Sequence, residues 1–374
     1  MNKEQKVLLL CSRLQLSEAE KQQVFEAIES GLNLQYLIAL AIKHKVLQLV
    51  GQHLISLDIN GKIDYQYKRL FDFYYLGNKE RNKAIFTQFT LIIENFERHN
   101  IKAVPLKGAY LAPYVYKDLG LRSLNDLDFL LSVDDLDKAS KLIGEMGFIP
   151  GNFNRRTDEI KPASRKNVLA HRMLGGNLYQ HVKKNDNPFL KCLSIDFSFD
   201  VDLKRNFHAS RELLAHAVES NIFGNKIFLL KPIDFLIHLC IHLYKESSNI
   251  QWVTFQQECN LIKFCDLREF FLNHADTLRP EQIAIRANEL AAVKAVYFSF
   301  YYLGEIYLDE FSKNVLELLP ISDTDFLEEF NSYDMRTTQK WRKTFWERFF
   351  SLSNKDEIID NDKQKEFENR FLGK

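Results

Sequence analysis

Several features that would place a chain quickly in a protein class are missing from this sequence. Cysteine is scarce: there are five among 374 residues, an odd number, and no two form a Cys-x-x-Cys pair. A disulfide framework or a zinc module is therefore not expected, whereas a reducing compartment is. Excess charge is missing too, because Lys+Arg and Asp+Glu both number 50. No overall field draws the protein toward nucleic acid or a membrane, so any such binding must depend on a local patch.

Long apolar runs are also absent. No apolar segment reaches the length that spans a bilayer, and the apolar run near the N-terminus is too short for a signal peptide. We therefore expect a cytoplasmic protein with no membrane partner.

What the sequence does contain is a change of periodicity along the chain. Apolar residues spaced by three and four predict helices in residues 1–77 and again in 231–374. Between them, the unit 78–230 begins with a helix and continues with short alternating or apolar runs, which predict strands. The expected strands are 101–106, 126–133, 147–150, 178–184 and 190–201. Together these elements predict an α+β fold, in which a small mixed β-sheet core is flanked by N-terminal and C-terminal helical regions.

The most informative of these strands holds two carboxylates, Asp126 and Asp128. Residues 125–131 alternate polar and apolar before becoming wholly apolar, and on a strand residues i and i+2 face the same side. The two carboxylates therefore project together, while Leu127 and Phe129 face a core. Neighbouring carboxylates repel each other, and they stay ionised together most readily when a cation lies between them. The pair is interpreted as a Mg²⁺ site for nucleotide phosphate.

Two further features fit such a site. Asp196 lies on the polar face of a strand that is expected to be half-buried, and it is the natural source of a third carboxylate. Lys107-Gly108 stands between a predicted strand and a predicted helix, where a glycine leaves backbone N–H groups open to a phosphate. A plain tight turn is the alternative interpretation of Gly108.

Residues 151–185 carry a local excess of positive charge. They contain eight basic and two acidic residues, although the whole chain is neutral. We expect an insertion that is either a solvated loop or a mobile basic lid over an anionic substrate. Farther along, His238 and His242 share a helix face. Because no glutamate of the His-Glu-x-x-His type lies between them, buried structural histidines are favoured over a zinc pair.

This ordered set of residues resembles a known family, the uncharacterised bacterial nucleotidyltransferases of the DNA-polymerase-β-like superfamily. The resemblance covers roughly residues 75–310 and rests on Leu106, Lys107, Gly108, Tyr116, Arg122, Asp126 and Asp128. The strand of Asp196 is similar to the family's third-carboxylate strand. Two departures stand out: Ala109 follows Gly108 where the wider superfamily has serine, and Ser198-Phe199 replace the usual His-Trp.

The resemblance implies a Mg²⁺-dependent enzyme that transfers NMP from an NTP, such as ATP, to an acceptor and releases pyrophosphate. The catalytic residues would be Asp126, Asp128 and Asp196. These would hold two Mg²⁺ ions, and Asp196 would also take the proton of the acceptor. The nucleotide or its phosphates would be bound by Lys107, Gly108, Arg122 and Lys263.

The sequence leaves the acceptor open. A small hydroxylated molecule, an RNA such as a tRNA 3′ end, and a protein side chain all fit, with the basic segment slightly favouring an anionic acceptor. Two other functions also stay open: a non-catalytic nucleotide-binding scaffold protein, and a tRNA-modifying nucleotidyltransferase toxin.

Overall fold

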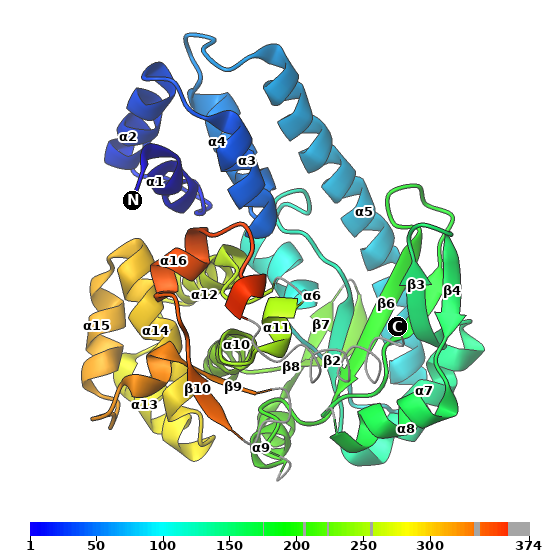
Figure 1. Ribbon diagram of the computed structural model, residues 1–374. Coiled ribbons are helices and arrows are strands. Elements are labelled where there is room, and N and C mark those ends of the chain that lie inside the picture. Colours follow the sequence, from blue (N-terminus) through cyan, green and yellow to red (C-terminus); the bar gives the residue numbers. More distant parts are fainter. Residues whose placement is uncertain (175, 205–206, 223, 255–256, 333–336, 358–374) are drawn as a thin grey trace.

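A six-stranded mixed sheet carries the acidic residues (Figure 1). The computed structural model describes residues 1–174, 176–204, 207–222, 224–254, 257–332 and 337–357. The strand order is β1-β2-β6-β5-β3-β4, with β2 and β6 parallel and the other neighbours antiparallel. The strands are β1 (Val104–Pro105), β2 (Leu127–Leu130), β3 (Ile149–Asn154), β4 (Glu159–Pro162), β5 (His181–Lys184) and β6 (Cys192–Ser198). The predicted α+β class with helical flanks is confirmed.

One long helix connects the N-terminal region to the sheet (Figure 1). Four helices come first: α1 (Lys3–Leu10), α2 (Glu18–Glu29), α3 (Leu34–Lys43) and α4 (Leu47–Leu57). The long helix α5 (Tyr65–Arg98) has 34 residues, and the expected unit boundary at residue 77 falls inside it. Its C-terminal half packs on the sheet, where the Phe89 ring stacks on Phe129 with centroids 5.8 Å apart. This aromatic contact buries one face of β2 and leaves the other face for its carboxylates.

The segments on either side of β2 form helices, and the one before β2 was predicted to begin at Lys107-Gly108. They are α6 (Gly108–Leu111), its π-helical continuation η1 (Ala112–Tyr116), the 3₁₀ turn η2 (Val133–Asp135) and α7 (Leu136–Glu145). Ser132 caps the second helix, because its hydroxyl accepts a hydrogen bond from the Asp135 N–H. Gly147 follows the helix with φ of 90°, a conformation that glycine adopts without strain.

Residues 151–185 contain regular elements, so the expectation of a solvated loop is wrong for most of the segment. They hold most of the hairpin β3–β4, the helix α8 (Arg165–Leu174) and strand β5. No sequence pattern indicated the hairpin, because few of its side chains are buried and no side chain of β4 is buried. Edge strands are held by backbone pairing and need no apolar alternation. Coverage of a substrate by this basic segment stays a proposal.

The C-terminal region is helical, as predicted. It contains α10 (Pro232–Ser247), α11 (Gln251–Thr254), α12 (Leu261–Asn273), α13 (Pro280–Glu289), α14 (Val293–Tyr307), α15 (Glu310–Glu317) and α16 (Phe345–Phe350), with short turns η3 (Asp325–Glu328) and η4 (Lys355–Glu357). Besides β4 and α8, no sequence pattern predicted α9 (His208–His216), the hairpin β7 (Val218–Ile222) and β8 (Asn225–Leu229), or the ribbon β9 (Glu329–Asn331) and β10 (Thr338–Lys340). Residues 358–374 of the expected C-terminal region lie outside the described residues.

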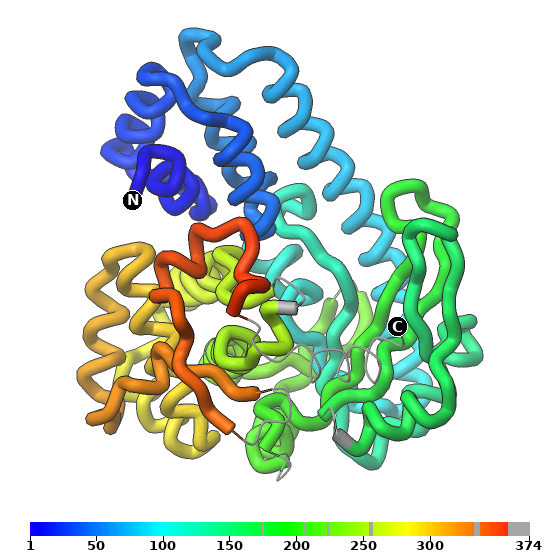
Figure 2. The backbone as a smooth tube through the Cα atoms, viewed as in Figure 1, coloured from blue at the N-terminus to red at the C-terminus, as the bar shows by residue number. Residues whose placement is uncertain are grey.

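The two helical regions share one hydrophobic core. Buried residues of α1–α4 and of α10–α15 form a continuous cluster that also includes Val104 of β1 and Leu130 of β2. Figure 2 shows the chain's first helices and its last described helix close together. At this contact the Lys43 ammonium donates to the carbonyls of Arg348 and Phe349, at 2.9 and 2.7 Å. The N-terminal region is therefore fixed against the C-terminal region rather than attached through α5 alone.

Two expected absences can be compared with the structure. All five cysteines are unpaired, which agrees with the prediction of no disulfide framework. Within the described ranges, no helix combines the length and the apolarity that crossing a bilayer requires.

Candidate functional site

The two acidic strands lie side by side in register. Because β2 and β6 pair in parallel, Asp128 stands directly opposite Asp196, and Phe129 opposite Phe197. Phe129 and Phe197 are fully buried, and successive strand residues point to opposite faces. The two aspartates therefore project from the face of the sheet that does not pack on α5.

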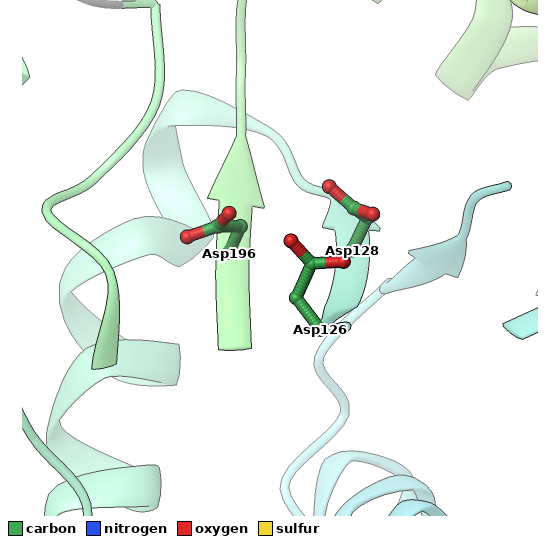
Figure 3. A group of neighbouring side chains, drawn as sticks. All are labelled: Asp126, Asp128 and Asp196. Carbon is green, nitrogen blue, oxygen red and sulfur yellow. The ribbon is translucent and has the colours of Figure 1, made fainter. Parts of the chain in front are cut away.

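Asp126 completes a group of three carboxylates. It lies two residues before Asp128, at the start of the same strand segment, as the alternating pattern predicted. Each of Asp126, Asp128 and Asp196 offers one oxygen, and these oxygens lie within 4.8 Å of one another. Figure 3 shows the three side chains gathered on one side of the two strands. Three carboxylate oxygens at this spacing form the kind of ligand set that a hard divalent cation prefers.

The group is electrostatically strained without a cation. Burial, with the charge of Asp128 added, raises the pKa of Asp126 to about 6. Burial and the charges of Asp126 and Asp128 raise the pKa of Asp196 well above its ordinary value. Neither Asp126 nor Asp196 has a hydrogen-bond or ion-pair partner among the described residues. Protons and divalent cations would therefore compete for these two carboxylates.

Lys107 contacts this group directly. Its ammonium lies 2.8 Å from the Asp128 carboxylate, and the charges of Asp128 and Asp126 raise its pKa despite the opposing effect of burial. The backbone at Lys107 has φ of 48° and ψ of −123°, a region that favours glycine and is strained for an L-residue with a side chain. This backbone conformation places the lysine side chain beside the carboxylates, at the point where α6 begins.

Gly108 is required by the close approach of Arg122. A Cβ atom at position 108 would lie 2.7 Å from Nη1 of Arg122. The predicted strand–glycine–helix order is present, although α6 itself has only four residues before the chain widens into η1. The glycine therefore has a packing reason that is independent of any phosphate contact.

Arg122 is held in a buried ion pair with Asp266. Its Nε and Nη2 donate to the two oxygens of Asp266 at 3.1 and 2.6 Å, and Nη1 donates to the Ser123 carbonyl at 2.7 Å. Tyr116 adds a hydrogen bond from its hydroxyl to Asp266 at 2.8 Å. This arrangement fastens the loop before β2 to α12, so the guanidinium can orient the carboxylate strand.

Lys263, also on α12, has a carboxylate partner of its own. Its ammonium pairs with Glu246 of α10 and donates to the Gln257 carbonyl at 2.7 Å. The structure thus brings all the residues of the predicted site into one neighbourhood, but it pairs Lys107, Arg122 and Lys263 each with an acidic group.

Sequence reasoning missed two other lysines, Lys45 and Lys245. Lys45 follows α3 with φ of 59°, and Asp126 is among the charges that raise its pKa, although burial lowers it more. Lys245 lies on α10, and burial followed by the charge of Lys107 lowers its pKa. In the sequence, Lys45 belongs to a short basic cluster with Lys43 and His44. Lys245 lies three residues after His242 and seven after His238, so helical periodicity alone could have placed it on their face.

The two histidines of α10 are close to the same charges. Their rings are 6.5 Å apart, and both nitrogens of buried His238 have no hydrogen-bond partner in the described part of the chain. Burial and the charges of Lys107 and Lys245 lower the pKa of His238 to about 3. A neutral, buried His238 is the state that these surroundings favour.

Comparison with known proteins gives one finding. The model of a family described as uncharacterised nucleotidyltransferase matches residues 30–307. The match starts at the end of α2 and stops at the last residue of α14, so it includes α3, the whole sheet and α10. Neither the curated proteins nor the solved structures give a significant match.

Proposed function

Because the chain belongs to a family of uncharacterised nucleotidyltransferases, we propose that it transfers a nucleoside monophosphate from an NTP to an acceptor and releases pyrophosphate. The observation that carries the proposal is the group of Asp126, Asp128 and Asp196, whose oxygens lie within 4.8 Å of one another. Family membership supports the reaction class, and the carboxylate group offers a place where the reaction could occur.

We place the protein in the DNA-polymerase-β-like superfamily. The support is the order of parts: a Lys-Gly turn, an arginine, two aspartates on one strand, a helix, and a third aspartate on the neighbouring parallel strand. The resemblance of the sequence motifs led us to expect a third carboxylate on a further strand.

The carboxylates fit a divalent cation by their chemistry. They offer hard oxygen ligands, and Asp126 and Asp196 have no other partner in the described residues. Asp126 and Asp128 would hold two Mg²⁺ ions together with Asp196. Bound there, Mg²⁺ would lower the pKa of the acceptor hydroxyl and stabilise charge at the attacked phosphorus.

The remaining roles belong to side chains of this chain. Asp196 accepts the proton of the acceptor hydroxyl. Lys107 and the N–H of Gly108 contact the leaving phosphates, while Arg122 keeps the carboxylate strand oriented through Asp266. Lys263 contributes positive charge from α12 on the same side of the site.

The test has a binding stage and a turnover stage. Calorimetry with ATP, GTP, CTP and UTP, each with and without Mg²⁺, identifies the nucleotide on the native protein and on Asp126→Asn. Pyrophosphate release is then followed with small-molecule, RNA and protein acceptors for native protein, Asp128→Asn and Asp134→Asn. Asp134 is exposed and lies just after the same strand, so its variant controls for charge removal.

We expect Mg²⁺-dependent nucleotide binding that Asp126→Asn weakens, and turnover that Asp128→Asn abolishes while Asp134→Asn leaves it intact. Turnover that survives in Asp128→Asn would refute the assignment of the carboxylates. Binding without pyrophosphate release in any acceptor screen would favour the scaffold function. Growth arrest on expression that Asp128→Asn relieves would favour the tRNA-modifying toxin.

A further inference from the structure

Six of the charged side chains around the three carboxylates form three direct ion pairs. These pairs are Lys107 with Asp128, Arg122 with Asp266, and Lys263 with Glu246. Four other charged side chains form no direct ion pair among the described residues. They are the carboxylates of Asp126 and Asp196 and the ammonium groups of Lys45 and Lys245.

The two remaining lysines have no carboxylate partner within the described residues. The Lys245 ammonium donates to the Val201 carbonyl at 3.3 Å, and the side chain of Lys45 makes no hydrogen bond there. Both lysines are half-buried. Against the effect of burial, Glu246 and Asp126 raise the pKa of Lys45, and Glu246, Asp128 and Asp200 raise that of Lys245. An ammonium group that lies partly out of water and in no direct ion pair can still gain stability from an anionic ligand.

The position of Lys45 is fixed by the packing of three segments. The preceding residue, His44, accepts a hydrogen bond from the Leu261 N–H at 3.0 Å through Nδ1, and its carbonyl accepts one from the Ile262 N–H at 3.2 Å. Gln48 bonds to Ser123, the neighbour of Arg122. The turn at residue 45 therefore lies between the start of α12 and the loop that leads to Asp126.

Lys245 reaches the other strand of the site. Its hydrogen bond to Val201 places the ammonium three residues beyond the end of β6, the strand that carries Asp196. The next residue, Glu246, is the partner of Lys263. Lys45 thus comes from the N-terminal region beside Asp126, and Lys245 comes from the C-terminal region beside β6.

We propose that Lys45 and Lys245 form an anion site for the pyrophosphate portion of the nucleotide, with one cation supplied by each helical region. The proposal deepens the proposed nucleotidyltransferase function and rests on it for the identity of the nucleotide. The choice of polyphosphate follows from the leftover charges, since the ligand must carry several negative charges to meet both ammonium groups. It must also accept a divalent cation that Asp126 and Asp196 can share, and a pyrophosphate group does both.

The first test is calorimetry with inorganic pyrophosphate, with and without Mg²⁺. Native protein is compared with Lys45→Met, Lys245→Met and Lys141→Met. Lys141 is an exposed residue of α7, with 82% of its side chain accessible, and it controls for loss of one positive charge. Methionine keeps the length of the lysine stem, and at position 45 it keeps the same left-handed backbone.

We expect each site variant to bind magnesium pyrophosphate about ten- to a hundredfold more weakly, because a charge-assisted hydrogen bond is lost. Lys141→Met should bind as the native protein does. Lys45→Arg and Lys245→Arg should restore most of the affinity. Equal affinity in the native protein and both methionine variants would overturn the proposal.

Thermal unfolding separates a ligand site from a structural role. Burial disfavours the positive charge at Lys45 and Lys245. Without ligand, the two methionine variants should therefore have a melting temperature equal to that of the native protein or higher. Pyrophosphate with Mg²⁺ should raise the melting temperature of the native protein and raise that of the variants much less. A lower melting temperature for the variants, with an unchanged shift on adding pyrophosphate, would make both lysines structural and refute the anion site.

Failure of this inference is distinguishable from failure of the proposed function. If an NTP and an acceptor give turnover but KM for the NTP is the same in Lys45→Met and Lys245→Met, the anion site is wrong and the function stands. If pyrophosphate binding depends on both lysines but no acceptor gives turnover, the anion site stands and the transfer reaction falls.

Discussion

The strained backbone at Lys107 leads to a prediction about stability that reverses the usual order of two residues. Alanine is normally more favourable than glycine by about 0.5–1 kcal/mol inside regular structure, because glycine loses more freedom on folding. At φ of 48° and ψ of −123° the Cβ atom is crowded, and a side chain costs roughly 1–3 kcal/mol. The difference between these two costs makes Lys107→Gly more stable than Lys107→Ala by about 0.5–2 kcal/mol.

The comparison is clean because both variants lose the same ion pair. The contact of Lys107 with Asp128 at 2.8 Å disappears in each, so its uncertain free energy cancels in the difference. Both variants should also lose magnesium pyrophosphate affinity equally. The difference in stability between the two variants therefore measures the backbone strain at position 107.

The assay is urea unfolding of the native protein and the two variants, with equal m-values required before free energies are compared. Lys141, an exposed position within α7, provides the matched control, since there alanine should exceed glycine by about 1 kcal/mol. If Lys107→Ala is as stable as Lys107→Gly, the strain at this position does not exist and the reasoning fails.

Three further outcomes are expected. Gly108→Ala should reduce nucleotide affinity, because its Cβ would lie 2.7 Å from Arg122 Nη1, whereas Gly144→Ala in open space on α7 should be stabilising by about 0.5–1 kcal/mol; equal behaviour in calorimetry and melting would contradict this. Burial lowers the pKa of His181 to about 4, so its contribution is complete above the unfolded pKa and is lost as the pH falls below it. Between pH 7 and pH 5 the free energy of unfolding of the native protein should therefore fall by about 2 kcal/mol more than that of His181→Gln. An equal fall for both proteins in denaturant unfolding would exclude this. The pKa of Asp126 is raised to about 6, so protons should compete with Mg²⁺ for this carboxylate. The rise in melting temperature that Mg²⁺ causes should therefore become smaller below pH 6. A rise of the same size at lower pH would refute this competition.

Local pattern was sufficient wherever a short segment determined its own conformation. The alternation around Asp126 and Asp128 predicted β2, because a half-buried strand needs only two faces of different polarity. The same argument predicted the strand of Asp196. The helix between Ser132 and Gly147 likewise depends on hydrogen bonds and dihedral angles within a few residues.

Local pattern failed for strands whose stability comes from pairing. The hairpin β3–β4 has few buried side chains, so its sequence reads as a solvated charged segment. The hairpin β7–β8 was missed for the same reason, because its buried and exposed side chains alternate only weakly. In both cases the backbone hydrogen bonds that hold the strands leave no trace in the order of polar and apolar residues.

The sequence by itself therefore determined the fold class, the two acidic strands and the kind of chemistry that three carboxylates allow. Only the tertiary structure decided which cations surround them. Arg122 meets Asp266, which is 144 residues away in the chain, and Lys45 reaches the site because the N-terminal and C-terminal helices share one hydrophobic core. Burial of apolar surface between distant helices brings these charges together, and no periodicity within any one segment encodes that meeting.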